Sequence, residues 1–382
     1  MVQCISVSHS RPPSTSSAAS FPGIWLYVKT KLGYWGINPE FLKDDTELKQ
    51  RLKEAHDAVI AKRFEEAEDM YHVLLTEAAA NDNVPAVNQI YECIADMFLL
   101  KNDLANAEKA FLDLLERLLA QHRPDADHGI LEISLKLASI YAQTGQHTKA
   151  EQAFHYVIER QRAHYSASLA RDRAKHLRHM YGEESITSQE VDVRTFTAAC
   201  HQAYGRYLYS LKRQVLTAGL NRKTVTFGYP IGVYEDAWPH FVEALSITSK
   251  LYNAAHPQML TLLDECGRTA LKQSNFAAAE QYFSTLISRC LASDVAVTSS
   301  VFGSSLPGYY AYLAECQWRL DKKAAAVETA KTGLKLARGL DNEAERNEAV
   351  AAAERYVIRL ESELKREADS QKGQGSKKGW FW

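Results

Sequence analysis

Apolar positions recur along the chain at helical spacing, and small residues alternate with aromatic ones in a fixed order. Within residues 130–141, Leu137, Ala138 and Tyr141 fall on one face of a helix, and Gly145 follows where that helix should end. In the next segment Ala150 precedes Phe154 by one helical turn. A small residue lets two helices approach closely, and the aromatic ring fills the remaining space. The stretch predicts two antiparallel helices that pack on each other.

The same order recurs through most of the chain. The alanines of the second helices are Ala67, Ala107, Ala150, Ala237, Ala279 and Ala326, at spacings of 40, 43, 87, 42 and 47 residues. A standard tetratricopeptide repeat (TPR) spans about 34 residues, so these units are longer, and the spacing of 87 marks an insertion. The pattern predicts an all-α, TPR-type α-solenoid of about six helix-turn-helix repeats, with a C-terminal capping helix at about 342–368.

Three regions follow from this reading. We expect the solenoid over residues 44–368, with an insertion at 213–233 whose glycines and Pro230 forbid a continuous helix. Residues 369–382 read as a flexible tail that ends in Trp380, Phe381 and Trp382. Residues 1–39 hold seven serines and no Asp or Glu, which is typical of a mitochondrial transit peptide, although a disordered tail remains the alternative. The aromatic residues within 21–37 suggest an interfacial membrane anchor or an arm packed on the first repeat.

Bulk properties and absent motifs narrow the function. The formal net charge of −2 gives no overall field that would attract nucleic acid. The six cysteines are scattered without a Cys-x-x-Cys pair and read as reduced core residues. We find no nucleophile–base arrangement, metal motif or phosphate-binding loop. We therefore expect no enzyme activity, no cofactor, no metal and no small-molecule substrate.

A long basic helix is expected at about 148–180, in the third repeat. Its cations are Arg160, Arg162, Arg171, Arg173, Lys175 and Arg178. They form a candidate site for anionic lipid headgroups or for an acidic partner, and the alternative is an ordinary solvated helix face.

The first helices of the repeats should line a concave surface that binds peptides. Its candidate residues are Asp96, Lys136, Arg206, Tyr209, Arg268, Lys272 and Arg319. Receptors for chaperone tails need Lys and Asn in this row, which the first repeats lack, so that role is disfavoured. The mixed charges suit a peptide of uneven charge, while salt bridges between adjacent helices are an equally good account of each residue.

Several stretches go beyond a general repeat pattern. These are residues 130–141, 203–208, 243–247 and 256–258. Together they resemble the mitochondrial tetratricopeptide repeat protein 19 family, over roughly residues 50–290. The resemblance implies a place at the mitochondrial inner membrane and a role in assembly and maintenance of respiratory complex III. It also implies complex III subunits as partners, peripheral contact with the inner membrane, and clearance of fragments of the iron–sulfur subunit.

Two hypotheses result. The first is a non-catalytic, protein-binding scaffold of the mitochondrial inner membrane that serves complex III. The alternative is a cytosolic TPR adaptor of the kinesin-light-chain type that binds cargo peptides, because those proteins use repeats of about this long period.

Overall fold

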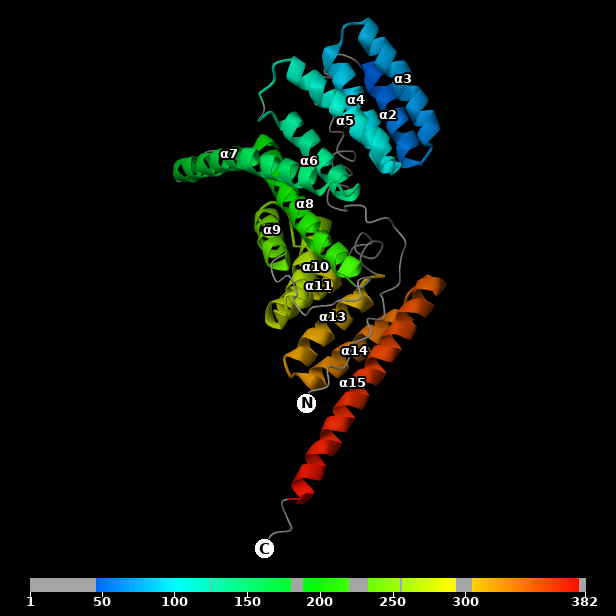
Figure 1. Ribbon diagram of the computed structural model, residues 1–382, viewed down its shortest axis with the longest axis vertical. Helices are drawn as coiled ribbons and strands as arrows, with labels where there is room; N and C mark the ends of the chain where they lie inside the picture. Colours follow the sequence, from blue (N-terminus) through cyan, green and yellow to red (C-terminus); the bar gives the residue numbers. More distant parts are fainter. Residues whose placement is uncertain are drawn as a thin grey trace. The chain divides into compact units, whose positions relative to one another are not determined.

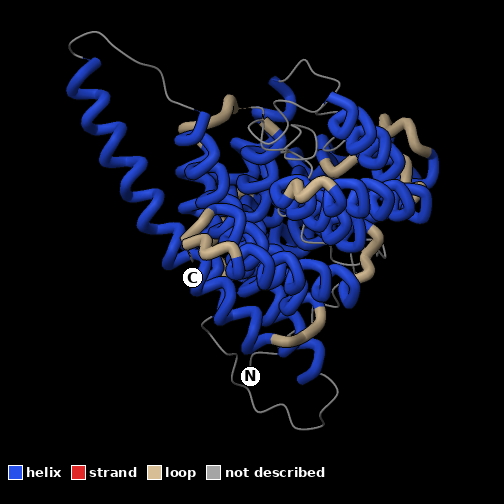
Figure 2. Tube along the Cα trace, turned by 90° about the horizontal axis from the view of Figure 1, so that it is seen from above, coloured by secondary structure: helices blue, strands red, loops and turns tan. Residues whose placement is uncertain are grey.

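The computed structural model of the chain describes residues 46–124, 126–179, 188–219, 233–254, 256–292 and 304–377. Within these ranges the regular elements are all helices, joined by short loops (Figure 2). The expected N-terminal segment 1–39, residues 220–232 of the insertion and the Trp-Phe-Trp end lie outside them. The chain divides into two compact units, which we call the N-terminal unit (Phe21–Leu211) and the C-terminal unit (Lys212–Trp382).

The N-terminal unit is a row of antiparallel helices (Figure 1). Their order is α2 (Thr46–Ile60), α3 (Phe64–Ala80), α4 (Val84–Leu100), α5 (Leu104–Ala120), α6 (His128–Gln143), α7 (His147–His179) and α8 (Ser188–Gly219), of which the residues from Lys212 on are assigned to the C-terminal unit. Each helix from α2 to α6 packs against the next one along the chain. Asn83, Asp103 and Asp127 cap α4, α5 and α6, because each side chain accepts a hydrogen bond from a free N–H of the first turn.

The C-terminal unit repeats this arrangement and ends in a long helix. It contains α9 (Val233–Thr248), α10 (Pro257–Lys272), α11 (Phe276–Ala292), α13 (Leu306–Arg319), α14 (Lys323–Arg338) and α15 (Glu343–Lys377). In Figure 1, α15 runs along α14. Its Val357 and Leu360 pack with Ala326, Val327 and Ala330 of α14, so that α15 covers the last repeat as a cap.

The small residues occupy the helix contacts that the sequence assigns to them. Each of the six second-helix alanines named above has no exposed surface. The aromatic residues one turn later, from Tyr71 to Phe283, are at most 2% exposed. Helices α10 and α11 approach closely at Gly267 of α10, because a Cβ atom there would lie 2.9 Å from the ring of Phe283 on α11. The predicted all-α, TPR-type solenoid is confirmed.

The turns between helices also repeat. A residue with positive φ follows the first helix of a pair at Lys62, Asn102, Gly145, Ser274 and Asp321. A second set, Asp82 and His122, follows the second helix of the first two pairs. The left-handed conformation lets the N–H groups after a helix bond to its last carbonyls and reverses the chain. Gly145 is the one glycine among these residues, and it suits this conformation because it has no Cβ atom.

Three helices are longer than the remaining ones. The prediction for α7 agrees with the structure to within a residue at each end. Helix α8 continues to Gly219, so the first residues of the expected 213–233 loop are helical. Helix α15 continues to Lys377 and includes residues that we expected in the tail.

Candidate functional site

The candidate groove residues are divided between the two units. Asp96 (α4), Lys136 (α6), Arg206 and Tyr209 (both α8) belong to the N-terminal unit. Arg268 and Lys272 (α10) and Arg319 (α13) belong to the C-terminal unit. Each set is described by itself.

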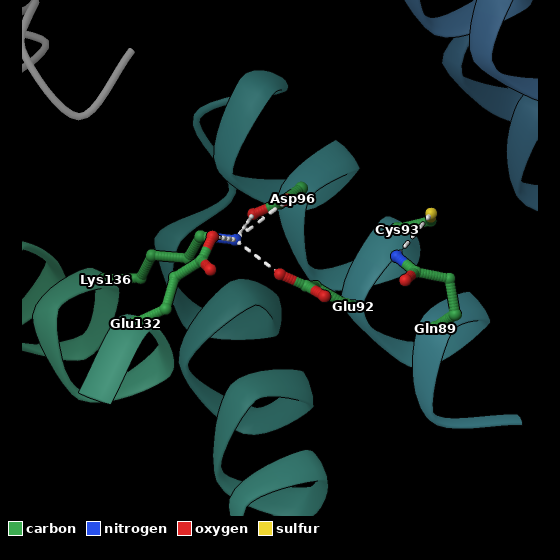
Figure 3. A network of polar contacts seen from close by, with 6 residues as sticks. All are labelled: Gln89, Glu92, Cys93, Asp96, Glu132 and Lys136. Atoms are coloured by element: carbon green, nitrogen blue, oxygen red, sulfur yellow. Dashed lines mark hydrogen bonds and ion pairs between the residues drawn. The ribbon is translucent and has the colours of Figure 1, made fainter. Parts of the chain in front are cut away.

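In the N-terminal unit, one lysine lies among three carboxylates (Figure 3). The Nζ of Lys136 is 2.8 Å from Oδ1 of Asp96, 3.1 Å from Oε1 of Glu92 and 3.5 Å from Oε1 of Glu132. The side chains of Lys136, Asp96 and Glu132 are at most 10% exposed, and that of Glu92 is 25% exposed. We call these four residues the Lys136 cluster.

Helical spacing brings the cluster together. Glu92 and Asp96 lie one turn apart on α4, and Glu132 and Lys136 lie one turn apart on α6. The ammonium group therefore bridges the second and third repeats. It also lies 5.3 Å from the ring centre of Phe111 on α5, where the ring face attracts a cation.

Burial and the neighbouring charges both act on the pKa values of the Lys136 cluster. Burial, reinforced by the charge of Glu92, raises the pKa of Asp96 from 3.8 to about 6, against the opposing charge of Lys136. Burial alone would lower the pKa of Lys136, but Asp96, Glu92 and Glu132 outweigh it and raise that pKa. Burial also raises the pKa of the neighbouring Cys93 thiol to about 12, so the thiol stays protonated. With all groups ionised the cluster carries a net charge of −2.

The structure thus places Asp96 and Lys136 in a buried contact between two helices, whereas the sequence pattern placed them on an exposed surface. The reason is that opposite charges on the first helices of successive repeats meet across the helix contact. The spacing of 40 and 44 residues from Lys136 back to Asp96 and Glu92 is close to the repeat length, and this signal could have revealed the pairing. Glu132, which the sequence analysis did not single out, completes the cluster.

The other groove candidates of this unit lie on α8. Arg206 and Tyr209 are both half-buried. The same helix packs against α7 through polar contacts, in which Gln161 donates to the carbonyl of Val193 at 3.0 Å and Tyr204 pairs with His155 at 3.1 Å. A role of Arg206 and Tyr209 in peptide binding stays a prediction.

In the C-terminal unit the candidate cations are exposed, and two of them pair with carboxylates that are less exposed. Arg268 forms an ion pair with Asp264, whose side chain is 10% exposed against 46% for the arginine. Arg319 donates from Nε to Oε1 of Glu315 at 2.8 Å, with side-chain exposures of 52% and 23%. Lys272, one turn after Arg268 on α10, is exposed.

Glu315 connects α13 to the capping helix. Its Oε2 accepts hydrogen bonds from Nη2 of Arg359 at 3.0 Å and from the hydroxyl of Tyr356 at 3.1 Å. Burial alone would raise the pKa of Glu315, but the bonds from Arg319 and Tyr356 and the nearby arginine charges outweigh it and hold the pKa below its ordinary value. The carboxylate therefore stays ionised. We call Glu315 and these three partners the Glu315 node.

Three of the six candidate cations of α7 have side chains that the structure describes. Arg160, Arg162 and Arg171 are exposed, while the side chains of Arg173, Lys175 and Arg178 lie outside the described part of the chain. Binding of an acidic partner or of lipid to this helix stays a prediction.

Two other kinds of site are absent from the described part of the chain. Among the described residues, no group of three or more His, Cys, Asp or Glu side chains is placed to hold a metal ion. None of the helices in the described ranges has both the length and the apolar character needed to cross a bilayer.

The helix pairs, their buried alanines and the capping helix define a TPR-type α-solenoid. Curated proteins similar to this chain are named tetratricopeptide repeat protein 19, mitochondrial. The human (Homo sapiens) protein is 25% identical over 238 residues, which are 62% of this chain and 55% of the human protein. The Danio rerio protein is 27% identical over 224 residues, covering 58% of this chain and 48% of its own. The chain thus spans about half the length of the curated relatives it matches.

The solved structures that resemble this chain are less similar to it in sequence than the curated proteins are. BtubC (BKLC) from P. vanneervenii is 13% identical with a TM-score of 0.47, over 77% of this chain and 92% of that protein. The assembly chaperone of RpL4 (Acl4) is 14% identical with a TM-score of 0.45, over 85% of this chain and 99% of that one. No protein-family model matches the chain.

Proposed function

We propose that the chain is a non-catalytic, protein-binding scaffold of mitochondria that acts in the assembly and maintenance of respiratory complex III. The observation that carries the proposal is the similarity to mitochondrial tetratricopeptide repeat protein 19 over about 60% of the chain, on a fold made of stacked helix pairs. Such arrays bind other polypeptides on surfaces that many repeats build together. Clearance of iron–sulfur subunit fragments and peripheral contact with the inner membrane are the finer parts of the proposal.

The experiment is fractionation of cells that express the epitope-tagged full chain at its natural level. We expect the protein in the mitochondrial fraction, with the inner membranes, and we expect complex III subunits to co-purify after mild detergent extraction. A matched sample of an unrelated tagged mitochondrial protein controls for carry-over of membranes.

Recovery in the cytosol alone would contradict the proposal and favour the alternative of a cytosolic adaptor that binds cargo peptides. Recovery in mitochondria without complex III subunits would keep the scaffold role and remove the specific partner.

A further inference from the structure

We propose that the exposed cations of α10, α13 and α15 around the Glu315 node form a docking surface for an acidic segment of a partner protein. The surface consists of Arg268, Lys272, Arg319 and Arg359, which we call the basic row. Helix α10 shares one core cluster with α13 through Leu260, Leu263, Tyr309 and Leu313, and Glu315 joins α13 to α15. The inference deepens the proposed function, because it names the chemistry of the segment that the scaffold binds.

The first argument is the way in which Glu315 holds two guanidinium groups. Its two oxygens bond separately to Arg319 of α13 and Arg359 of α15, at 2.8 and 3.0 Å. A guanidinium group has five N–H donors, so one bond to Glu315 leaves donors for a further acceptor. The side chains remain 52% and 42% exposed. Two planar cations are thus fixed side by side at the surface, which lowers the entropy that a bound carboxylate would have to remove.

The second argument is the surplus of charge. Three of the four cations pair with only two carboxylates, Asp264 and Glu315, whose side chains are 10% and 23% exposed. The basic row and these two carboxylates together carry a net charge of +2, and the cations are more exposed than the carboxylates. The Lys136 cluster has the reverse pattern, since its surplus of −2 is buried and offers a partner little surface.

The third argument concerns the kind of anion. Arginine binds carboxylates through two parallel N–H bonds, and this geometry suits Asp and Glu side chains. Aromatic rings lie beside the guanidinium groups: Phe276 is 5.8 Å from that of Arg319, and Tyr356 is 4.8 Å from that of Arg359. The net charge of −2 on the whole chain opposes general attraction of polyanions, so the attraction is local to this face.

The test uses the full chain and a fluorescein-labelled octaglutamate peptide, with binding followed by fluorescence anisotropy at two salt concentrations. We expect the double variant Lys272→Gln/Arg319→Gln to bind at least about tenfold more weakly than the unmodified protein, because it removes two of four cations. Lys272 lies outside the Glu315 node, so the single variant Lys272→Gln should weaken binding without disturbing that node.

The matched control is Lys331→Gln/Arg338→Gln. These cations of α14 are 46% and 61% exposed and pair with Glu361 and Glu354 of α15, so the control removes the same charge from another face. We expect its affinity to stay within about twofold of the unmodified protein. Thermal melts confirm that each variant is folded before its affinity is compared.

Equal losses in both double variants would overturn the inference, because the effect would then be one of total charge. Tighter binding of a thymidine octanucleotide than of octaglutamate would also overturn it, in favour of phosphate recognition. Co-purification with complex III separates this inference from the proposed function. If the Lys272/Arg319 variant retains complex III as well as the unmodified protein does, the docking surface is wrong and the scaffold role stands. If octaglutamate binding depends on the basic row but complex III never co-purifies, the inference stands and the proposed partner is wrong.

Discussion

At the scale of single residues, the position of a charge within the repeat decides whether it is a surface or a core feature. Lys136 and Arg319 were both expected to line a groove. Lys136 faces carboxylates on a neighbouring helix and is buried, whereas Arg319 pairs on its own helix and stays exposed. Sequence periodicity predicts the face of a helix on which a residue lies, but the partner on the next helix depends on how the two helices pack.

Replacement of Lys136 by Met should strongly destabilise the N-terminal unit. The substitution leaves three carboxylates close together without their counter-charge, two of them buried, and breaking such a group typically costs about 3–5 kcal/mol. Urea denaturation followed by circular dichroism measures the loss. The control Glu92→Gln, at the more exposed carboxylate, should cost roughly 1 kcal/mol or less. A Lys136→Met protein as stable as the control would show that the cluster contributes little.

Asp96 should make stability depend on pH in a defined direction. Its pKa is raised from 3.8 to about 6 in the folded chain, so the folded state takes up a proton more readily than the unfolded state. The associated stability is fully present below pH 3.8 and is lost as the pH rises through 6. The difference in unfolding free energy between the unmodified protein and Asp96→Asn should therefore rise, on the order of 1 kcal/mol, from pH 7 to pH 5. Denaturation series at both pH values measure it, and a difference independent of pH would contradict the shift.

At the scale of helices, small residues at fixed positions made most of the helix pairs predictable from the sequence. The second-helix alanines and the following aromatics were readable from the sequence because they contact each other within one helix pair. The pairing of Glu315 with Tyr356 and Arg359 was missed although their separations of 41 and 44 residues are close to the repeat length. The reason is that the capping helix lies beyond the last second-helix alanine, so the repeat pattern did not assign its residues to a helix contact. The boundary of the insertion was harder still to predict, since glycines at 219–232 do not determine where α8 ends.

Gly267→Ala should separate α10 from α11. The added Cβ would lie 2.9 Å from the buried ring of Phe283, so helices or ring must shift, at a cost of about 1–3 kcal/mol. Gly308→Ala is the control, because nothing lies within 4 Å of the corresponding Cβ in α13. That change should be neutral or stabilising by up to about 1 kcal/mol. Thermal unfolding distinguishes them, and equal melting temperatures would argue against close contact at Gly267.

Two turns with positive φ should respond differently to substitution. Gly145 has a φ of 77°, so Gly145→Ala should destabilise the turn between α6 and α7 by about 1–2 kcal/mol. Asn102, with a φ of 62°, occupies the same place between α4 and α5, and Asn102→Gly should be nearly neutral. Urea midpoints of the two variants test the contrast, which fails if Gly145→Ala is as stable as the unmodified protein.

At the scale of the whole molecule, the end of the array is protected by α15. The helix covers the alanines and Val327 of α14, and ion pairs join Arg338 to Glu354, Lys331 to Glu361 and Lys323 to Glu367. A solenoid without such a cap exposes an apolar helix face that associates with other copies.

Removal of residues 341–382 should therefore destabilise the C-terminal unit and cause self-association. Loss of the buried Val357 and Leu360 alone withdraws about 3–6 kcal/mol of apolar burial. Light scattering after size-exclusion chromatography detects the oligomers. Removal of 369–382 alone is the control, because it keeps these packed residues and the Glu367 ion pair, and it should leave the mass and melting temperature unchanged. A monomeric protein after the longer deletion would contradict the protective role of α15.

The matching left-handed residues Asp82 and His122 have a consequence for how such a chain changes in length. They stand 40 residues apart with φ values of 48° and 55°, so the block from Asn83 to His122 enters and leaves through the same backbone geometry. A duplicated or deleted copy of this block would join its neighbours without a new connector. Recombination could thus lengthen or shorten the array by one helix pair at a time, and alter its reach while every junction stays the same.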